Sequence, residues 1–217
     1  LEAIGQPVFE ALRRESKVTH FYFLDGQRTC LLRVHRPEKS GDMINRSTAL
    51  QAERTGKMAA GLELGRLGTL TLRVVAPVRQ AGVPVGYVEL GKEIEDVLKT
   101  IHMRTELQLA VVLRKRYLDR ESWQDGMRML GREPRWDSLK NGVLAYASHE
   151  SMTNVLAQVA DEISGSVAHE MRAWKVSCGD KKLRVTALSL QDAGEREVGD
   201  LVVVRDISGE QTEFVRM

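Results

Sequence analysis

The chain has 217 residues, a net charge of +2, 42% hydrophobic residues and 5% aromatic residues. The near balance of charge argues against a surface for nucleic acid or an anionic bilayer, and the hydrophobic content excludes wholesale disorder. Cys30 and Cys178 are too few for a disulfide framework, and by themselves for a zinc cluster. The length allows one large core or two cores of about 100 residues each.

The first half of the chain predicts a helix, two strands, a loop with a short helix, and three strands. An apolar stripe from Leu1 to Leu12 is helical, and Pro7 predicts a kink or a late start. Ser47 is the expected N-cap of the short helix and Gly56 its stop. The expected elements are strands near 21–24 and 29–35, a loop over 37–45, a helix over 47–54, and strands near 57–64, 69–79 and 85–91.

The second half predicts a strand, a long insertion, a helix and three more strands. Apolar residues at spacings of mostly three and four predict the helix over 149–173. The other expected elements are a strand over 109–113, the insertion over 117–141, strands over 174–177, 182–190 and 199–204, and a closing helix within 209–217.

Two segments recur in the same order in both halves. Leu72–Ala76 (LRVVA) matches Leu183–Ala187 (LRVTA), and Val85-Gly86 matches Val198-Gly199 at nearly the same offset. We therefore infer tandem modules over residues 1–104 and 105–217. By this match Arg184 is the counterpart of Arg73, but the other polar residues do not recur, so we expect the second module to be structural.

The sequence contains fragments of catalytic motifs, but each lacks a residue that the chemistry requires. Gly86–Lys92 has the spacing of a phosphate loop, but Glu93 stands where a hydroxyl must bind magnesium, and the segment alternates like a strand. His149-Glu150 and His169-Glu170 each lack the second histidine of a zinc-binding helix. We therefore expect no catalytic residue, no metal and no cofactor in this chain.

Strand alternation places ionic side chains on one face of the first sheet. The opposite, apolar face suits packing on the N-terminal helix, with Leu32, Val34, Leu62, Leu64, Leu72, Val74, Val88 and Leu90. The residues expected on the polar face are Tyr22, Arg33, His35, Glu63, Thr71, Arg73, Tyr87 and Glu89. Two interpretations stay open: a solvated face with cross-strand ion pairs, or a pocket for a small anionic or zwitterionic molecule, covered by the loop and short helix.

Each candidate residue has a structural alternative. Arg33 and Arg73 hold a ligand carboxylate, or they pair with Glu63 and Glu89. His35 donates a hydrogen bond to the ligand and adds pH sensitivity, or it is a structural histidine bonded to the following loop. Tyr22 and Tyr87 form the walls of the pocket, or they are ordinary packing residues.

The order of elements, repeated twice, resembles the double Cache (PAS-like) sensor domains of two-component sensor kinases and chemoreceptors. The segments that carry the resemblance are Phe21–Gly26, Leu31–Pro37, Gly41-Asp42, Gly61–Gly65, Arg73–Val78, Gly86–Gly91, Trp123–Arg132 and Gly199–Ile207. The resemblance implies an α+β fold of two antiparallel sheets flanked by helices, with a long N-terminal helix. It also implies that residues 1–104 are the membrane-distal, ligand-binding module and 105–217 the membrane-proximal one.

The resemblance further implies an extracytoplasmic, periplasmic sensor tethered to the inner membrane, of which this chain is an excised, non-enzymatic fragment. Family ligands are amino acids, carboxylates or amines. Arg46 stands in the region of the lid motif of the amino-acid-binding subgroup, whose aromatic pair is missing here, so a simple carboxylate is an equal expectation. The N-terminal helix is the expected homodimer contact. The alternative is a module for structure, dimerisation or protein interaction without a ligand, with Trp123, Met127 and Trp136 as its partner surface.

Overall fold

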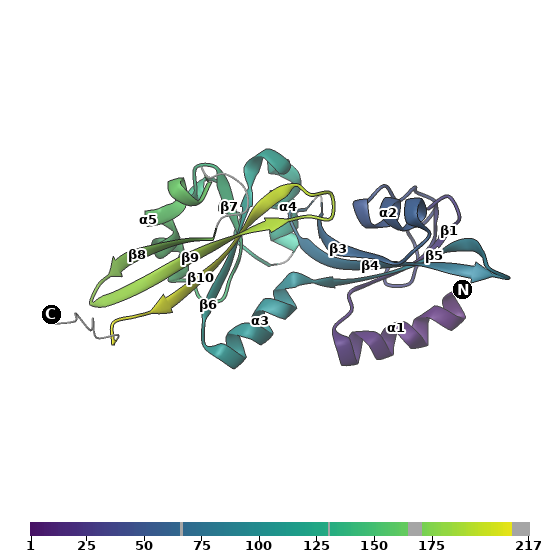
Figure 1. The fold of residues 1–217 in the computed structure, drawn as a ribbon, viewed down its shortest axis with the longest axis horizontal. Helices are drawn as coiled ribbons and strands as arrows, with labels where there is room; N and C mark the ends of the chain where they lie inside the picture. Colours follow the sequence, from purple (N-terminus) through teal and green to yellow (C-terminus); the bar gives the residue numbers. More distant parts are fainter. Residues whose placement is uncertain (66, 130, 165–170, 210–217) are drawn as a thin grey trace, which may run out of the picture. The chain divides into compact units, whose positions relative to one another are not determined.

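The computed structural model describes residues 1–65, 67–129, 131–164 and 171–209, which fold into two compact units. The first unit contains Leu1–Gly65, Thr69–Val97 and Gln191–Arg196. The second contains Leu98–Leu190, the described residues from Glu197 onward, and Leu67 and Gly68. Each unit has its own five-stranded sheet with helices beside it (Figure 1), so the expected α+β fold of two PAS-like modules is confirmed. The boundary at residues 104 and 105 stays a prediction.

The first sheet has the strand order β2-β1-β5-β4-β3 and antiparallel pairing throughout. Asp25 closes the β1–β2 turn by accepting the amide hydrogens of Gln27 and Thr29. Ala81 and Gly82, both with positive φ, form the tight turn between the two longest strands. The strands are β1 (His20–Asp25), β2 (Cys30–Arg33), β3 (Ala59–Leu64), β4 (Leu70–Gln80) and β5 (Val83–Glu93).

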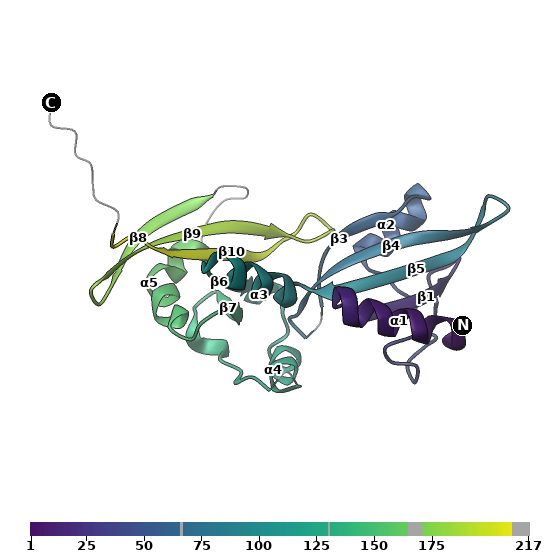
Figure 2. The ribbon, with the colours of Figure 1, turned by 90° about the horizontal axis from the view of Figure 1, so that it is seen from below.

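Helix α1 (Glu2–Ser16) covers the apolar face of the first sheet (Figure 2). It begins before Pro7, so a late start is wrong. The helix approaches closely at Gly5, where a Cβ atom would lie 2.9 Å from the Phe23 ring and from a Val34 methyl group. The buried cluster below α1 consists of Phe9, Val18, Phe21, Leu32 and Val34, with Val88 and Leu90 packed against it.

The expected apolar face is therefore correct under β1, β2 and β5. On β4, Leu72 is 45% exposed and does not join the cluster, nor does its cross-strand partner Leu62. The helix covers only part of the sheet, so alternation identified the face but overestimated its burial.

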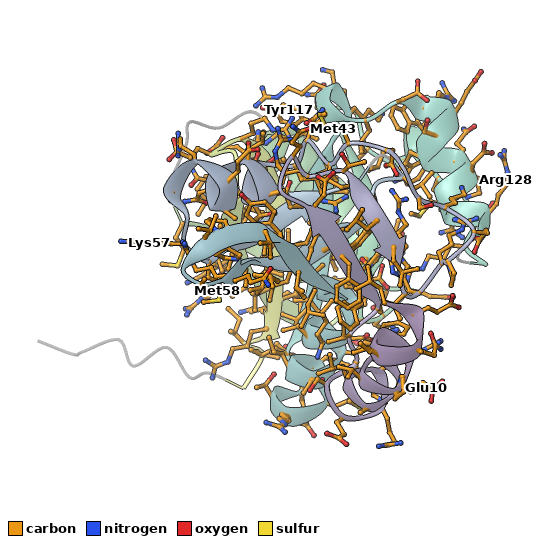
Figure 3. All side chains as sticks on the ribbon, turned by 90° about the vertical axis from the view of Figure 1, so that its right-hand side faces the viewer. Glu10, Met43, Lys57, Met58, Tyr117 and Arg128 are labelled. Carbon is orange, nitrogen blue, oxygen red and sulfur yellow. The ribbon has the colours of Figure 1, made fainter. Side chains whose placement is uncertain are left out.

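Helix α2 (Ser47–Thr55) lies on the opposite face of this sheet, which it was expected to cover. We call α2 and its N-cap residue Arg46 the lid. Figure 3 shows Glu10 on α1 and Met43 in the loop before α2 on opposite sides of the sheet. Ala49 and Ala52 are fully buried against it, and Gly56 ends the helix with a φ of 63°. The cluster under α2 consists of Tyr22, Leu24, Cys30, Ile44, Ala49, Ala52, Ala59, Val75 and Tyr87.

The second sheet repeats the first, with the strand order β7-β6-β10-β9-β8. Helix α5 (Met152–Ser164) takes the place of α2 in chain order and covers one face with an apolar core. The strands are β6 (Gln108–Arg114), β7 (Gly142–Ala147), β8 (Arg172–Cys178), β9 (Lys181–Gln191) and β10 (Glu197–Asp206), and the other helices are α3 (Ile94–Thr105), α4 (Arg120–Met129), η1 (Lys115–Tyr117) and η2 (Trp136–Ser138).

Several expectations for the second half are wrong. The helix expected to reach residue 173 is described as far as Ser164 and cannot extend to 173, because strand β8 begins at Arg172. Strand β7 and helices α3 and α4 were missed: α4 lies in the segment expected to be an insertion, and α3 in the charged stretch taken as the module boundary, although Ile94, Val97, Leu98 and Ile101 have helical spacing. The rest of that helix at 165–170 and the closing helix at 210–217 lie outside the described residues.

Equivalent residues of the LRVVA and LRVTA segments point to different faces of their sheets. Arg73 is 7% exposed and faces α2, whereas Arg184 is exposed and its neighbours Leu183 and Val185 belong to the α5 core. The two arginines therefore point to different sides of their sheets. A shift of one residue reverses every side chain of a strand, so the motif marks equivalent strands but not equivalent positions.

Candidate functional site

Helix α2 is held over the sheet at its N-terminus by a residue of β3. Arg46 is the N-cap residue and gives no side-chain cap, so the expected Ser47 cap is wrong. Instead, Glu63 accepts hydrogen bonds from the Thr48 backbone amide at 2.8 Å and from the Thr48 hydroxyl at 3.0 Å. Both side chains are buried. A carboxylate at this position satisfies an unpaired helix amide and complements the helix dipole.

Arg28, at the β1–β2 turn, donates hydrogen bonds to α2 and to the loop before it. Its guanidinium donates to Glu53 on α2 at 2.8 Å, to the Asn45 side chain at 2.7 Å and to the Ile44 carbonyl at 3.0 Å. At the other end of the helix, Arg79 of β4 donates to the Gly56 carbonyl. The lid therefore carries polar ties at both ends in addition to its apolar contacts.

A buried carboxylate joins the lid to the sheet beneath it. Glu89 of β5 is fully buried, and its Oε1 accepts a hydrogen bond from Arg73 of β4 at 2.6 Å and another from Arg46 of the lid at 2.5 Å. We call Arg46, Glu63, Arg73 and Glu89 the lid cluster. Because a buried ion pair must offset the loss of hydration, this bridge depends on both arginines remaining in place.

Three polar atoms of the lid cluster lack partners among the described residues. They are Glu89 Oε2, Arg46 Nε and Arg73 Nε, and each is shielded from solvent. Buried polar atoms are nearly always hydrogen-bonded in native proteins. The lid cluster therefore retains one acceptor and two charged donors for further hydrogen bonds.

The Tyr22 ring is the centre of the cationic part of this face. The guanidinium carbons of Arg46, Arg33 and Arg73 lie 5.0, 5.3 and 5.9 Å from its centroid. Tyr22 and Tyr87 are each 5% exposed and pack under α2. Tyr22, Tyr87 and the three arginines thus lie on one face, and both tyrosines pack in the cluster under α2, as the structural alternative describes; their role as pocket walls stays a prediction.

Arg33 has a partner that the sequence analysis did not consider. It donates to Asp42 at 2.6 Å and to the Lys39 carbonyl at 2.7 Å, both in the loop before α2. This hydrogen bond and the charge of Arg33 lower the pKa of Asp42. Arg33 therefore holds the loop, and of the two expected arginine–glutamate pairings only that of Arg73 with Glu89 is observed.

His35 lies at the edge of the sheet, where its Nδ1 accepts the Phe21 amide hydrogen at 3.1 Å. Burial lowers its pKa. The His20 ring lies 4.8 Å from the His35 ring, and burial followed by the charge of Arg73 lowers the pKa of His20 to about 3. Both histidines are therefore neutral near pH 7. Because His35 bonds to Phe21, the expected bond to the following loop is wrong.

Four residues of this region were missed from the sequence: Arg28, Asp42, Thr48 and His20. His20 could have been found, since it precedes the expected strand by one residue and alternation places it beside Tyr22. The others act from loops and from the lid, where no periodicity indicates direction. Within the described residues no group of three His, Cys, Asp or Glu side chains is placed to hold a metal ion.

The chain matches the family model described as "Double sensory domain of two-component sensor kinase" over residues 1–211. It therefore belongs to this family, the double Cache sensor domains. A search of curated proteins finds no match.

Solved structures of sensor domains are similar at low identity. An extracellular ligand binding receptor from Desulfohalobium retbaense is 12% identical with a TM-score of 0.46, over 92% of this chain and 32% of that one. The ligand-binding domain of a Campylobacter jejuni chemoreceptor in complex with 4-methylisoleucine is 9% identical with a TM-score of 0.47, over 98% and 74%. The V. cholerae histidine kinase DctB sensor domain is 9% identical with a TM-score of 0.45, over 94% and 78%. This chain thus spans about a third of the first of these receptors.

Proposed function

We propose that this chain is the extracytoplasmic, periplasmic sensor region of a bacterial transmembrane receptor, non-enzymatic itself, and that it binds a small carboxylate, amino acid or amine under α2. Family membership supports the sensory role. No helix of the described residues is long and apolar enough to cross a membrane. In this proposal the sensor transmits a conformational change to a cytoplasmic output domain of the same receptor.

The observation that carries the proposal is the bridge from Arg46 through Glu89 to Arg73. It joins the lid to the sheet, and it leaves one acceptor and two donors unpaired in a buried place. A ligand carboxylate fits the arginine donors, since guanidinium groups bind carboxylates in a planar fork. A ligand hydroxyl or ammonium group fits Glu89 Oε2.

The signal follows from differential affinity. Because Arg46 belongs to the lid and Arg73 to the sheet, a ligand that bonds to both favours the closed lid over an open one. Such a ligand shifts the lid equilibrium tenfold for each 1.4 kcal/mol, approximately, by which it binds the closed form better. The closed lid is then the state that the receptor reports.

Calorimetric titration with single amino acids, small carboxylates and small amines tests this proposal. We expect a subset to bind, and Arg46→Gln to weaken that binding at least about tenfold, because a charged hydrogen bond is lost. Arg36→Gln is the matched control, since Arg36 pairs with Glu38 on the surface. Binding that Arg46→Gln leaves unchanged contradicts the site, and a panel in which nothing binds contradicts the ligand class.

The Glu89→Gln variant distinguishes the two kinds of ligand. An ammonium ligand loses affinity, because the carboxylate that holds it is neutralised. A simple carboxylate gains affinity, because Glu89 no longer competes for Arg46 and Arg73. The sign of the change in Kd therefore separates an amine from a plain acid, and an amino acid, which carries both groups, changes less than either.

We also propose a homodimer through α1, which carries a second apolar stripe away from the sheet. Leu1, Ile4 and Val8 are 59%, 71% and 47% exposed and lie at spacings of three and four. Sedimentation should show that Ile4→Glu converts dimers to monomers, whereas Glu10→Gln, on the same helix, leaves them intact. A protein that is monomeric at all concentrations contradicts the dimer. A stable dimer without any ligand binding favours the purely structural alternative.

A further inference from the structure

A cavity in the second unit lies outside the lid cluster and has no role in the proposed function. Its volume is about 550 Å³, within the usual range for sites of small molecules. It is lined by the start of β6, the start of α5, the β8–β9 turn region and the end of β10. We call it the α5 cavity.

The floor of the α5 cavity is apolar. Met152, Val155, Leu183 and Val204 line it and are all members of the buried α5 core. Cys178 lines it as well, as a free and partly buried thiol. An apolar floor of this kind accommodates a short hydrocarbon chain or ring, which gains free energy on leaving water.

The rim of the cavity is polar and carries both signs of charge, with Lys181 and Arg205 beside Glu106 and Asp206. Gln108 uses its side-chain carbonyl to accept the Ser148 hydroxyl hydrogen, which leaves its NH2 group as a donor at the cavity wall. Lys181 lies on the rim, 3.5 Å from Asp206, in a pair that is largely exposed. The Asp206 carboxylate is also bonded to the amide and hydroxyl of Ser208, so it is satisfied without Lys181.

An exposed ion pair contributes little to stability, so Lys181 is free to turn to another anion. The first turn of α5 also borders the cavity, where the helix dipole favours negative charge, although the amides of Met152 and Thr153 are bonded to the carbonyls of His149 and Glu150. From the floor and rim together, we infer that the α5 cavity is a second binding site, for a small amphiphilic carboxylate with an apolar body of several carbons. This inference stands apart from the lid cluster and does not rest on the proposed function.

The position of the cavity lets a bound ligand contact the chain where it enters and where it leaves the second sheet, and so transmit a signal along the chain. Gln108, the first residue of β6, pairs with Val204 near the end of β10. The chain therefore enters and leaves the second sheet beside the cavity. A molecule bound there contacts both the entering and the leaving segment.

Methyl NMR of the intact chain tests the inference, with hexanoate as the probe and hexanol and hexylamine as matched controls. Met152 lies in the cavity, whereas the exposed Met43 and Met58 belong to the first unit and report non-specific effects. We expect hexanoate to shift the Met152 methyl signal saturably, with a Kd below about 1 mM. We expect hexanol and hexylamine to bind more weakly.

Two variants complete the test. Lys181→Gln should weaken hexanoate binding up to about fivefold without changing hexanol binding, because it removes one exposed charge. Cys178→Leu should weaken binding of both, because the larger side chain takes space at the apolar floor of the cavity. A Met152 signal that hexanoate does not shift, or that shifts together with Met43 and Met58, overturns the inference. So does hexanoate binding that is unchanged in the folded Lys181→Gln variant.

Discussion

At the scale of single residues, the first unit contains a carboxylate that is buried between two arginines. Glu89 is fully buried, and its bonds reach Arg73 on the same sheet and Arg46 on the lid. Removing one partner of a buried pair leaves the others charged in a medium of low dielectric constant. The stability of the first unit and the closure of its lid therefore depend on the same side chain.

We predict that Glu89→Gln destabilises the first unit by about 3 kcal/mol, because Arg46 and Arg73 lose their counter-charge while the shape of the side chain is kept. Urea unfolding measures this. Glu38→Gln, which removes a surface partner of Arg36, should leave the midpoint unchanged. Equal effects of the two substitutions would contradict the buried role of Glu89.

The neutral His20 makes stability depend on pH. Its pKa is lowered to about 3 from 6.5 in the unfolded chain, by burial and by the charge of Arg73. The unfolded state therefore binds a proton that the folded state does not, so this stability is complete above pH 6.5 and is lost as the pH falls toward 3. The pKa of His35 is lowered by burial as well, with the same sign.

We predict that the free energy of unfolding falls less between about pH 7.5 and about pH 5 in His20→Gln than in the wild type. Urea unfolding at each pH measures this. Glu93 lies 3.8 Å from His20, and burial raises its pKa, so protonation of Glu93 stabilises the fold as the pH falls. Glu93→Gln should therefore steepen the loss. An identical pH profile for the wild type and His20→Gln would show that His20 titrates normally.

At the scale of elements, α2 is a short helix that cannot be stable by itself and depends on its ties. Glu63 bonds to its first turn, Arg28 to Glu53 in its last turn, and Arg79 to the carbonyl of Gly56 at its end. Two small alanines let it lie close to the sheet. The position of α2 therefore depends both on these polar contacts and on the apolar contacts of Ala49 and Ala52.

We predict that Arg28→Gln speeds amide hydrogen exchange in α2 about tenfold, because bonds from a charged group to Glu53, Asn45 and the Ile44 carbonyl are lost. Exchange in β4 and β5 should not change. Arg54→Gln is the matched control, since Arg54 lies exposed on the same helix. Unchanged exchange in α2 would show that its apolar contacts suffice.

At the scale of the whole molecule, the two units share one strand order but differ under the lid helix. The lid face of the first sheet carries Arg73 and Glu89, whereas α5 covers an apolar core that includes Leu156, Val185 and Val202. The two units therefore share the strand pairing of the sheet but differ in the side chains buried on it. The expected partner surface at Trp123 and Met127 is wrong, since both are at most 2% exposed.

Because each unit has its own core, we predict two unfolding steps. All three tryptophans belong to the second unit, and Cys30 is buried in the first. In a Cys178→Ser background, Leu156→Ala should lower the stability reported by tryptophan fluorescence by about 3 kcal/mol, because it opens a cavity. Thiol labelling of Cys30 should keep its own midpoint. Coincident transitions in both proteins would show a single cooperative unit.

Much of this architecture could be predicted from periodicity and turn chemistry alone. Alternation places Tyr22, Glu63, Arg73, Tyr87 and Glu89 on one face, because side chains of a strand alternate strictly, and the order of elements indicates a lid above them. The stop of the lid helix at Gly56 also follows from local residues. These are properties of short segments, so the amino-acid sequence determines them without reference to distant parts.

The partners of these side chains were decided by the tertiary structure. No spacing in the chain indicates that Arg46 meets Glu89, that Arg33 turns to Asp42, or that Glu63 caps the helix at Thr48, because each of these pairs is joined across a loop or between elements. The α5 cavity likewise combines residues from both ends of the second unit. Local pattern determines which face a residue occupies, whereas loop geometry and packing determine which charge it meets there.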